Sequence, residues 1–188
     1  MVELVDYRKA WPAEFQHVGG RLRGALGSTA MRIDHIGSTA VPGLRAKDVL
    51  DIQVTVAAIE PRVETLVLAA GFRRPPGVWH DHRPPDATGP DDDWRKLFFL
   101  EPAGDRRVNL HVREAGRANQ RYALLFRDFL VAHPAMAAAY GELKVRLAAG
   151  LRDEHDYADV KDPAVDLIYL AALDWAGHVR WHPTAPDA

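Results

Sequence analysis

Apolar residues recur at helical spacing near the beginning of the chain and again through its last third. The first such series, ending just before Gly27, predicts an amphipathic helix; its apolar positions are Trp11, Phe15, Val18, Leu22 and Leu26. A second helix is predicted to begin at Pro61 and to end at Gly71. From about Ala118 onward we expect three more helices, interrupted at Pro134 and Gly150.

Other segments alternate between apolar and polar residues, which is typical of half-buried strands. Residues 31–36 form one predicted strand, and a second ends at Val56. In the second strand every other residue is apolar, so Asp51, Gln53 and Thr55 are expected to project together from the opposite face. The sheet should therefore carry a polar surface on one side.

A hairpin is predicted further along, where residues 94–101 and 106–113 flank a Pro-Ala-Gly-Asp turn. We expect a mixed sheet with an N-terminal helix within residues 1–115, and a helical half at residues 116–188 packed on it. With 188 residues and 47% apolar content, the whole chain is expected to form a single domain.

A proline-rich stretch at residues 74–93 separates the predicted elements. A loop of this length inside a compact domain is usually a lid, a substrate loop or a disordered stretch. It contains His80 and His82, which stand two residues apart and could bind zinc together with His111. A histidine-based metallohydrolase is therefore one open hypothesis.

Composition narrows the function classes. The chain has 24 Lys and Arg against 26 Asp and Glu, so no basic excess favours binding to a long nucleic acid. It has no cysteine, which excludes disulfides, thiolate zinc sites and thiol nucleophiles. No stretch is long and apolar enough to predict a membrane span, and the charged N-terminal residues do not resemble a signal peptide. We therefore expect a cytoplasmic protein without a membrane partner.

The candidate chemistry lies where Gly37-Ser38-Thr39 follows the first predicted strand and Asp51 lies on the second. Glycine lets the backbone approach a bulky anion, the serine hydroxyl and the amides supply donors, and an aspartate can hold Mg²⁺. These features are typical of nucleotidyl-transfer sites. Gln53 stands where a second metal-binding carboxylate is expected, so the metal half of the site is incomplete. The structural alternative is a tight turn followed by an ion-paired acid.

Several longer motifs carry a resemblance to a known family. They are His35-Ile36-Gly37-Ser38-Thr39-Ala40-Val41-Pro42-Gly43-Leu44, Asn109-Leu110-His111-Val112, Phe126-Arg127-Asp128-Phe129-Leu130 and Tyr140-Gly141-Glu142-Leu143-Lys144. In these motifs the chain resembles the GrpB-like family of uncharacterised proteins. The resemblance implies an α+β fold of two layers with a nucleotidyltransferase-like mixed sheet, and similarity to a domain fused to dephospho-CoA kinase in some bacteria. The chain departs from the family at Asp48, where proline is usual.

The leading hypothesis is a nucleotidyltransferase-like enzyme that binds a nucleotide or another phosphorylated small molecule with Mg²⁺. The candidate catalytic residues are Asp51, which would also hold the metal, and His111 and His35 for proton transfer. The candidate phosphate or substrate ligands are Gly37, Ser38, Thr39, Lys47, Gln53, Arg127 and Lys144. Each lysine, arginine and histidine also has a structural alternative as an ion-paired or hydrogen-bonded residue.

A second hypothesis, motivated by Gln53, is a binding module that retains the nucleotide pocket and lacks turnover. Kinase chemistry is disfavoured because the chain contains no Gly-x-x-x-x-Gly-Lys-Ser/Thr sequence. The acceptor substrate, the preferred nucleotide and the oligomeric state do not follow from these motifs.

Overall fold

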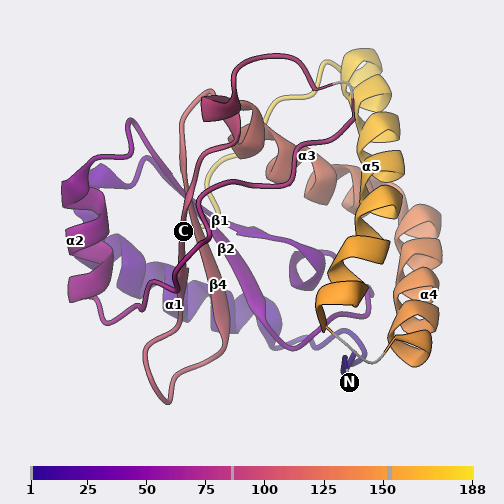
Figure 1. Cartoon of the computed structure of the whole chain (residues 1–188), viewed down its shortest axis with the longest axis horizontal. Helices are drawn as coiled ribbons and strands as arrows, with labels where there is room; N and C mark the ends of the chain where they lie inside the picture. Colours follow the sequence, from indigo (N-terminus) through magenta and orange to yellow (C-terminus); the bar gives the residue numbers. More distant parts are fainter. Residues whose placement is uncertain (1, 86, 152–153) are drawn as a thin grey trace.

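The computed structural model describes residues 2–85, 87–151 and 154–188, apart from the side chains of 154–156 and 158. Figure 1 shows a sheet at the centre, with α1 and α2 on one side and α3, α4 and α5 on the other. The helices are α1 (Trp11–Leu26), α2 (Pro61–Ala69), α3 (Ala118–Ala132), α4 (Pro134–Gly150) and α5 (Glu154–Val179). The strands are β1 (Arg32–Ile36), β2 (Leu50–Val56), β3 (Leu97–Leu100) and β4 (Val108–Glu114).

The four strands form one mixed sheet in the order β1-β2-β4-β3. Strands β1 and β2 are antiparallel, β2 and β4 are parallel, and β3 and β4 form the antiparallel hairpin. In the parallel pair Asp51 lies opposite Asn109, and Gln53 lies opposite His111. Residues opposite each other in register point to the same face, so these four polar side chains share one surface of the sheet.

The apolar face of the sheet packs against α1 and α2. Ile52 and Val54 of β2 and Leu110 of β4 are fully buried there, together with Trp11 and Phe15 of α1. Burial of side chains of this size stabilises the fold by about 1.5–3 kcal/mol each. This core fixes the face from which Asp51 and Gln53 project.

A second apolar core lies on the other side, where α3, α4 and α5 pack together. Leu124, Leu125 and Leu130 of α3 are buried there, and the loop after β1 contributes Val41 and Leu44. The helical half therefore covers the polar surface of the sheet and leaves room for a pocket between the two.

The predicted α+β fold is confirmed, and the elements agree closely with the apolar patterns. Helix α1 ends at Leu26 before Gly27, which adopts a positive φ of 53°. Helix α2 begins at Pro61, and β3 and β4 form the predicted hairpin. None of the described helices is both long and apolar enough to cross a lipid bilayer.

Candidate functional site

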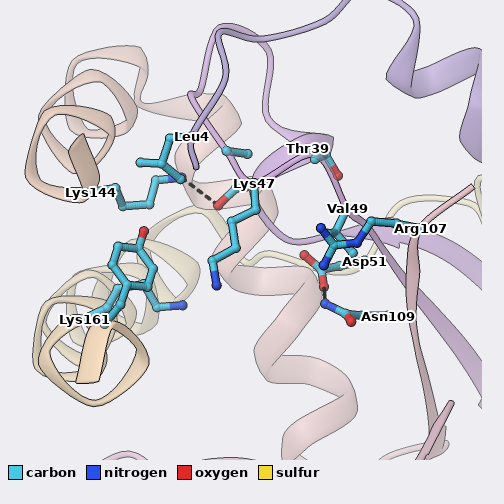
Figure 2. Close-up of a pocket in the computed structure, with 12 residues that line it drawn as sticks. Leu4, Thr39, Lys47, Val49, Asp51, Arg107, Asn109, Lys144 and Lys161 are labelled. Atoms are coloured by element: carbon cyan, nitrogen blue, oxygen red, sulfur yellow. Dashed lines mark hydrogen bonds between the residues drawn. The ribbon is translucent and has the colours of Figure 1, made fainter. Parts of the chain in front are cut away.

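A pocket of about 290 Å³ opens between the carboxyl-side loop of β1, the first residues of β2 and β4, and helices α4 and α5. The predicted residues Ser38, Thr39, Lys47, Asp51 and Lys144 all line it. Figure 2 shows Asp51 on the sheet side of this hollow, with Lys47 reaching into it from the loop and Lys144 and Lys161 from the helices. The serine turn and the acidic strand therefore open into the same space.

Gly37 allows the loop to pass directly over Asp51. Its backbone has φ 68° and ψ −167°, a region that is essentially restricted to glycine. A Cβ atom added there would lie 2.8 Å from Cβ and Cγ of Asp51 and still closer to Oδ2. The absence of a side chain at Gly37 is thus what brings Ser38 beside the carboxylate.

Asp51 is held ionised by its neighbours on the sheet. Its side chain is 28% exposed, and Asn109 Nδ2 donates a 2.9 Å hydrogen bond to Oδ1. Burial opposes the charge, but His111, Asn109 and Lys161 outweigh it and keep the pKa of Asp51 below its ordinary value. His111 Nε2 lies 3.8 Å from Oδ1. Burial and the adjacent Arg113 lower the pKa of His111 to about 4, so this imidazole is neutral at pH 7.

Cationic side chains make up much of the remaining wall. Lys144 of α4 is buried and donates to Ser38 Oγ at 2.9 Å and to the carbonyl oxygen of Arg45. Burial, reinforced by Lys161, lowers the pKa of Lys144 to about 7. Lys47 lies over the ring of Tyr157, with its ammonium 5.2 Å from the centroid. Arg107 and Lys161 complete the cationic set. A wall of this kind attracts anions.

Gln53 lies two residues beyond Asp51 on the same face but is fully buried behind the pocket. Its Oε1 accepts a 2.6 Å hydrogen bond from Arg113 Nη1, and its Nε2 donates to the carbonyl oxygen of Gln120 at 3.2 Å. Because both ends of the amide are used within the protein, Gln53 is not brought to the pocket surface.

Asp81 anchors the proline-rich loop to the sheet. Its carboxylate accepts two 2.8 Å hydrogen bonds from Arg113, one of 2.8 Å from Lys96 and one of 3.0 Å from Asn119. Burial raises the pKa of Asp81, but the positive charges of Arg113 and Lys96 outweigh that effect and hold this pKa far below its ordinary value. The loop at residues 74–93, of which residue 86 lies outside the described part, is thus fastened behind the candidate site.

Within the described ranges, no three His, Cys, Asp or Glu side chains gather in a way that could hold a metal ion. His82 Nε2 instead contacts Asp166 of α5 at 2.9 Å, and His80 forms an isolated bridge with Arg95. The structure therefore does not assemble His80, His82 and His111 into the zinc site that a metallohydrolase would require.

His35 and Arg127 are not brought to the pocket. His35 precedes Ile36, which is opposite Asp51 in register, so alternation turns the imidazole to the α1 side. There it stacks on Phe15 with 4.8 Å between ring centroids, and its Nε2 shares a 2.9 Å hydrogen bond with Thr39. Burial lowers the pKa of His35 to about 4.

Arg127 of α3 is buried and joins structural partners. It donates to the carbonyl oxygen of His35 at 2.8 Å and forms ion pairs with Asp128 and Asp187 at 2.8 and 2.7 Å. The cation expected to face a phosphate is thus used to fasten the helical half to β1.

Asp48, the departure from the family pattern, does not enter the pocket wall. It accepts hydrogen bonds from Arg8 at 2.5 Å, from Trp11 Nε1 at 2.9 Å and from Arg106. These donors keep the pKa of Asp48 below its ordinary value although burial opposes ionisation. The extra charge is therefore neutralised on the α1 side of the sheet.

Arg107, Tyr157 and Lys161 line the pocket but are not among the candidate site residues predicted from the sequence. Arg107 precedes β4 and alternates in phase with Asn109 and His111, so the sequence pattern alone could have placed it on the polar face of the sheet. Tyr157 comes from the first turns of α5, and no local pattern indicates that this end of the helix reaches the sheet.

Comparisons with known proteins agree with the motif resemblance. Residues 1–170 match the family model described as GrpB protein. The chain is 40% identical over 97% of its length to a dephospho-CoA kinase of Mycolicibacterium paratuberculosis, of which it covers 48%, so it spans about half of that relative. It is 34% identical to UPF0157 protein BH1888 of Halalkalibacterium halodurans, over 91% of this chain and 82% of that protein.

Solved structures extend the comparison. The crystal structure of GrpB from Enterococcus faecalis has a TM-score of 0.73 and 27% identity, covering 92% of this chain and 98% of that one. A structure of Cid1 in complex with the UTP analogue UMPNPP has a TM-score of 0.48 and 15% identity, covering 76% of this chain and 41% of Cid1. From its motifs, the family match and its relatives, the chain belongs to the GrpB family.

Proposed function

We propose that the pocket binds a nucleotide or another phosphorylated small molecule. This proposal rests on one observation: the Ser38 hydroxyl lines the same pocket as four cationic side chains, those of Lys47, Lys144, Lys161 and Arg107. Lysine and arginine side chains neutralise phosphate charge, and a glycine-serine turn lets a bulky anion approach the backbone. The similarity to proteins named dephospho-CoA kinase supports a ligand of this class.

Titration calorimetry with pyrophosphate, ADP, ATP and dephospho-CoA tests the proposal. We expect binding of at least one phosphorylated ligand, and we expect Lys161→Gln to weaken it about tenfold because one cation is removed from the wall. Arg62→Gln serves as the control, since Arg62 is an exposed cation of α2 on the other side of the sheet. Absence of heat with all four ligands would reject the proposal.

Nucleotidyl transfer to a small acceptor is a second candidate. It is favoured by the close passage of Gly37 over Asp51, which aligns Ser38 with the carboxylate in the pocket. Mg²⁺ would be expected at Asp51 and would neutralise charge on the phosphates when bound. The residues around Asp51 do not fit a metal pair, because Gln53 and Asn109 are neutral amides already engaged within the protein.

Release of pyrophosphate from nucleoside triphosphates, measured with and without Mg²⁺ and with a panel of small hydroxyl acceptors, tests this candidate. Turnover that depends on both Mg²⁺ and Asp51 would support transfer. Tight nucleotide binding without turnover would leave a binding protein as the function.

A further inference from the structure

The positions beside Asp51 on the sheet present neutral groups that are already engaged. Asn109, directly opposite in register, donates its amide N–H to Asp51 Oδ1 at 2.9 Å. His111 comes next on β4 and faces the same oxygen atom at 3.8 Å. Mg²⁺ prefers carboxylate oxygens in octahedral geometry. Here one of the two carboxylate oxygen atoms, Oδ1 of Asp51, already accepts a hydrogen bond from a neighbouring side chain, and no second carboxylate lies opposite it.

A guanidinium occupies the place where residue 53 would ligate a cation. Arg113 Nη1 lies 2.6 Å from Gln53 Oε1, and the Lys96 ammonium lies 3.4 Å from His111 Nδ1. A divalent ion bridging positions 51 and 53 would therefore stand against Arg113 and Lys96, whose two positive charges the single Asp81 carboxylate neutralises only in part, in a poorly solvated region where repulsion is strong. The charges behind the pocket oppose a metal at this position.

The charges within the pocket favour a different ligand. The negative charge of Asp51 acts on Lys144, and Lys161 acts on Asp51, so these groups lie within electrostatic reach of one another. With Arg107 they supply the positive charge that Mg²⁺ would otherwise bring to a phosphate. The remaining capacity of Asp51 is that of a hydrogen-bond acceptor.

We propose that the pocket binds its phosphorylated ligand without a divalent metal: Lys144, Lys161 and Arg107 neutralise the phosphates, and Asp51 accepts a hydrogen bond from a hydroxyl or amino group of the ligand. The ligand class is therefore a phosphate ester that carries such a donor group, as a ribose phosphate does. This inference rests on the proposed phosphate-binding function and specifies how the binding is achieved.

Calorimetric titration of the full chain with pyrophosphate and with ADP, each in EDTA and in excess Mg²⁺, tests the metal. We expect both probes to bind in EDTA, and Mg²⁺ to leave the affinity unchanged or to weaken it by sequestering the phosphates. Binding that appears only with Mg²⁺ would overturn the metal-free inference while supporting the proposed function. Absence of binding in both conditions would overturn the proposed function, and this inference with it.

Asp51→Asn adds a second test, because the change in pyrophosphate affinity should have opposite signs if Asp51 binds a metal and if it does not. If Asp51 held a metal, this change would weaken pyrophosphate binding. Without a metal, it removes a repulsive charge and should strengthen pyrophosphate binding about fivefold. Asp91→Asn is the matched control, because Asp91 is an exposed carboxylate paired with Arg83 in the proline-rich loop and should leave affinity unchanged. Weaker binding to Asp51→Asn in Mg²⁺ would overturn the inference.

Asp51→Ala tests the hydrogen bond to the ligand. Pyrophosphate offers no sugar hydroxyl, whereas ADP does, so the loss of the acceptor should lower the affinity for ADP relative to pyrophosphate by about tenfold. An unchanged ratio of the two affinities would overturn the proposed contact. Urea midpoints of both variants, compared with the wild type, confirm that the probes are titrated into folded protein.

Discussion

Replacing Gly37 with alanine should destabilise the protein, because the loop at this position passes directly over Asp51 in the pocket. The substitution introduces a Cβ atom at φ 68° and ψ −167°, where non-glycine residues are strained by about 1–3 kcal/mol. The same Cβ would lie 2.8 Å from Cβ and Cγ of Asp51, which adds overpacking of about 1–3 kcal/mol. Rotation of Asp51 cannot relieve the contact without breaking its hydrogen bond from Asn109.

We therefore expect Gly37→Ala to lower the free energy of unfolding by about 2–6 kcal/mol, against a total of about 5–15 kcal/mol for a typical domain. Urea denaturation followed by circular dichroism measures this difference. Gly43→Ala is the matched control: Gly43 has φ 80°, but an added Cβ would meet no atom within 4 Å. It should incur only the backbone strain.

A double-mutant cycle isolates the contact itself. Combining Gly37→Ala with Asp51→Gly removes the clash, so the two changes should couple by about 1–3 kcal/mol in the direction of relief. Equal losses for the two alanine variants, together with a coupling energy near zero, would refute the claim that Gly37 is required by its contact with Asp51.

Three further predictions concern charges. Burial lowers the pKa of Lys144 to about 7, so its charge is present below that pH and lost above it. Pyrophosphate affinity measured by calorimetry should therefore fall from pH 6 to pH 8.5, and an equally steep fall of affinity in Lys144→Met would contradict this. Asp81→Asn leaves Arg113 and Lys96 without their shared carboxylate and should lower stability in urea by about 3–5 kcal/mol; a loss below about 1 kcal/mol would argue against the anchor. Arg127→Met should destabilise the protein by a similar amount and yet leave ligand affinity within about twofold of the wild-type value, because Arg127 lies outside the pocket. A loss of affinity without a loss of stability would place Arg127 in the site.

The sequence predicted the elements of this fold well where local signals agreed with packing. Trp11, Phe15 and Leu22 recur at helical spacing and are buried in α1, and the glycine at position 27 ends that helix. The phase of β2 followed from its apolar residues, and this phase placed Asp51 on the polar face. These features depend on short-range patterns, which a single sequence displays.

The candidate site was less predictable because its other half comes from distant segments. Arg127 and Lys144 are both basic residues of the helical half, yet one fastens α3 to β1 and the other reaches Ser38. The role of Asp81 was likewise invisible, since its partner Arg113 lies 32 positions away. Which cation reaches the pocket depends on how the helices pack on the sheet, and the sequence pattern does not encode that geometry locally.

Pro163 lies inside α5, between Lys161 in the pocket wall and Asp166, which holds His82 of the anchored loop. Proline has no N–H, so the helix lacks one backbone hydrogen bond at this position. His82 contacts α5 on both sides of Pro163, through Asp162 at 3.8 Å and Asp166 at 2.9 Å, whereas Tyr157 and Lys161 of the pocket wall lie before the proline. The helix thus has one backbone hydrogen bond fewer just after the residues that line the pocket, and this is where an added N–H donor, as in Pro163→Ala, would stiffen it.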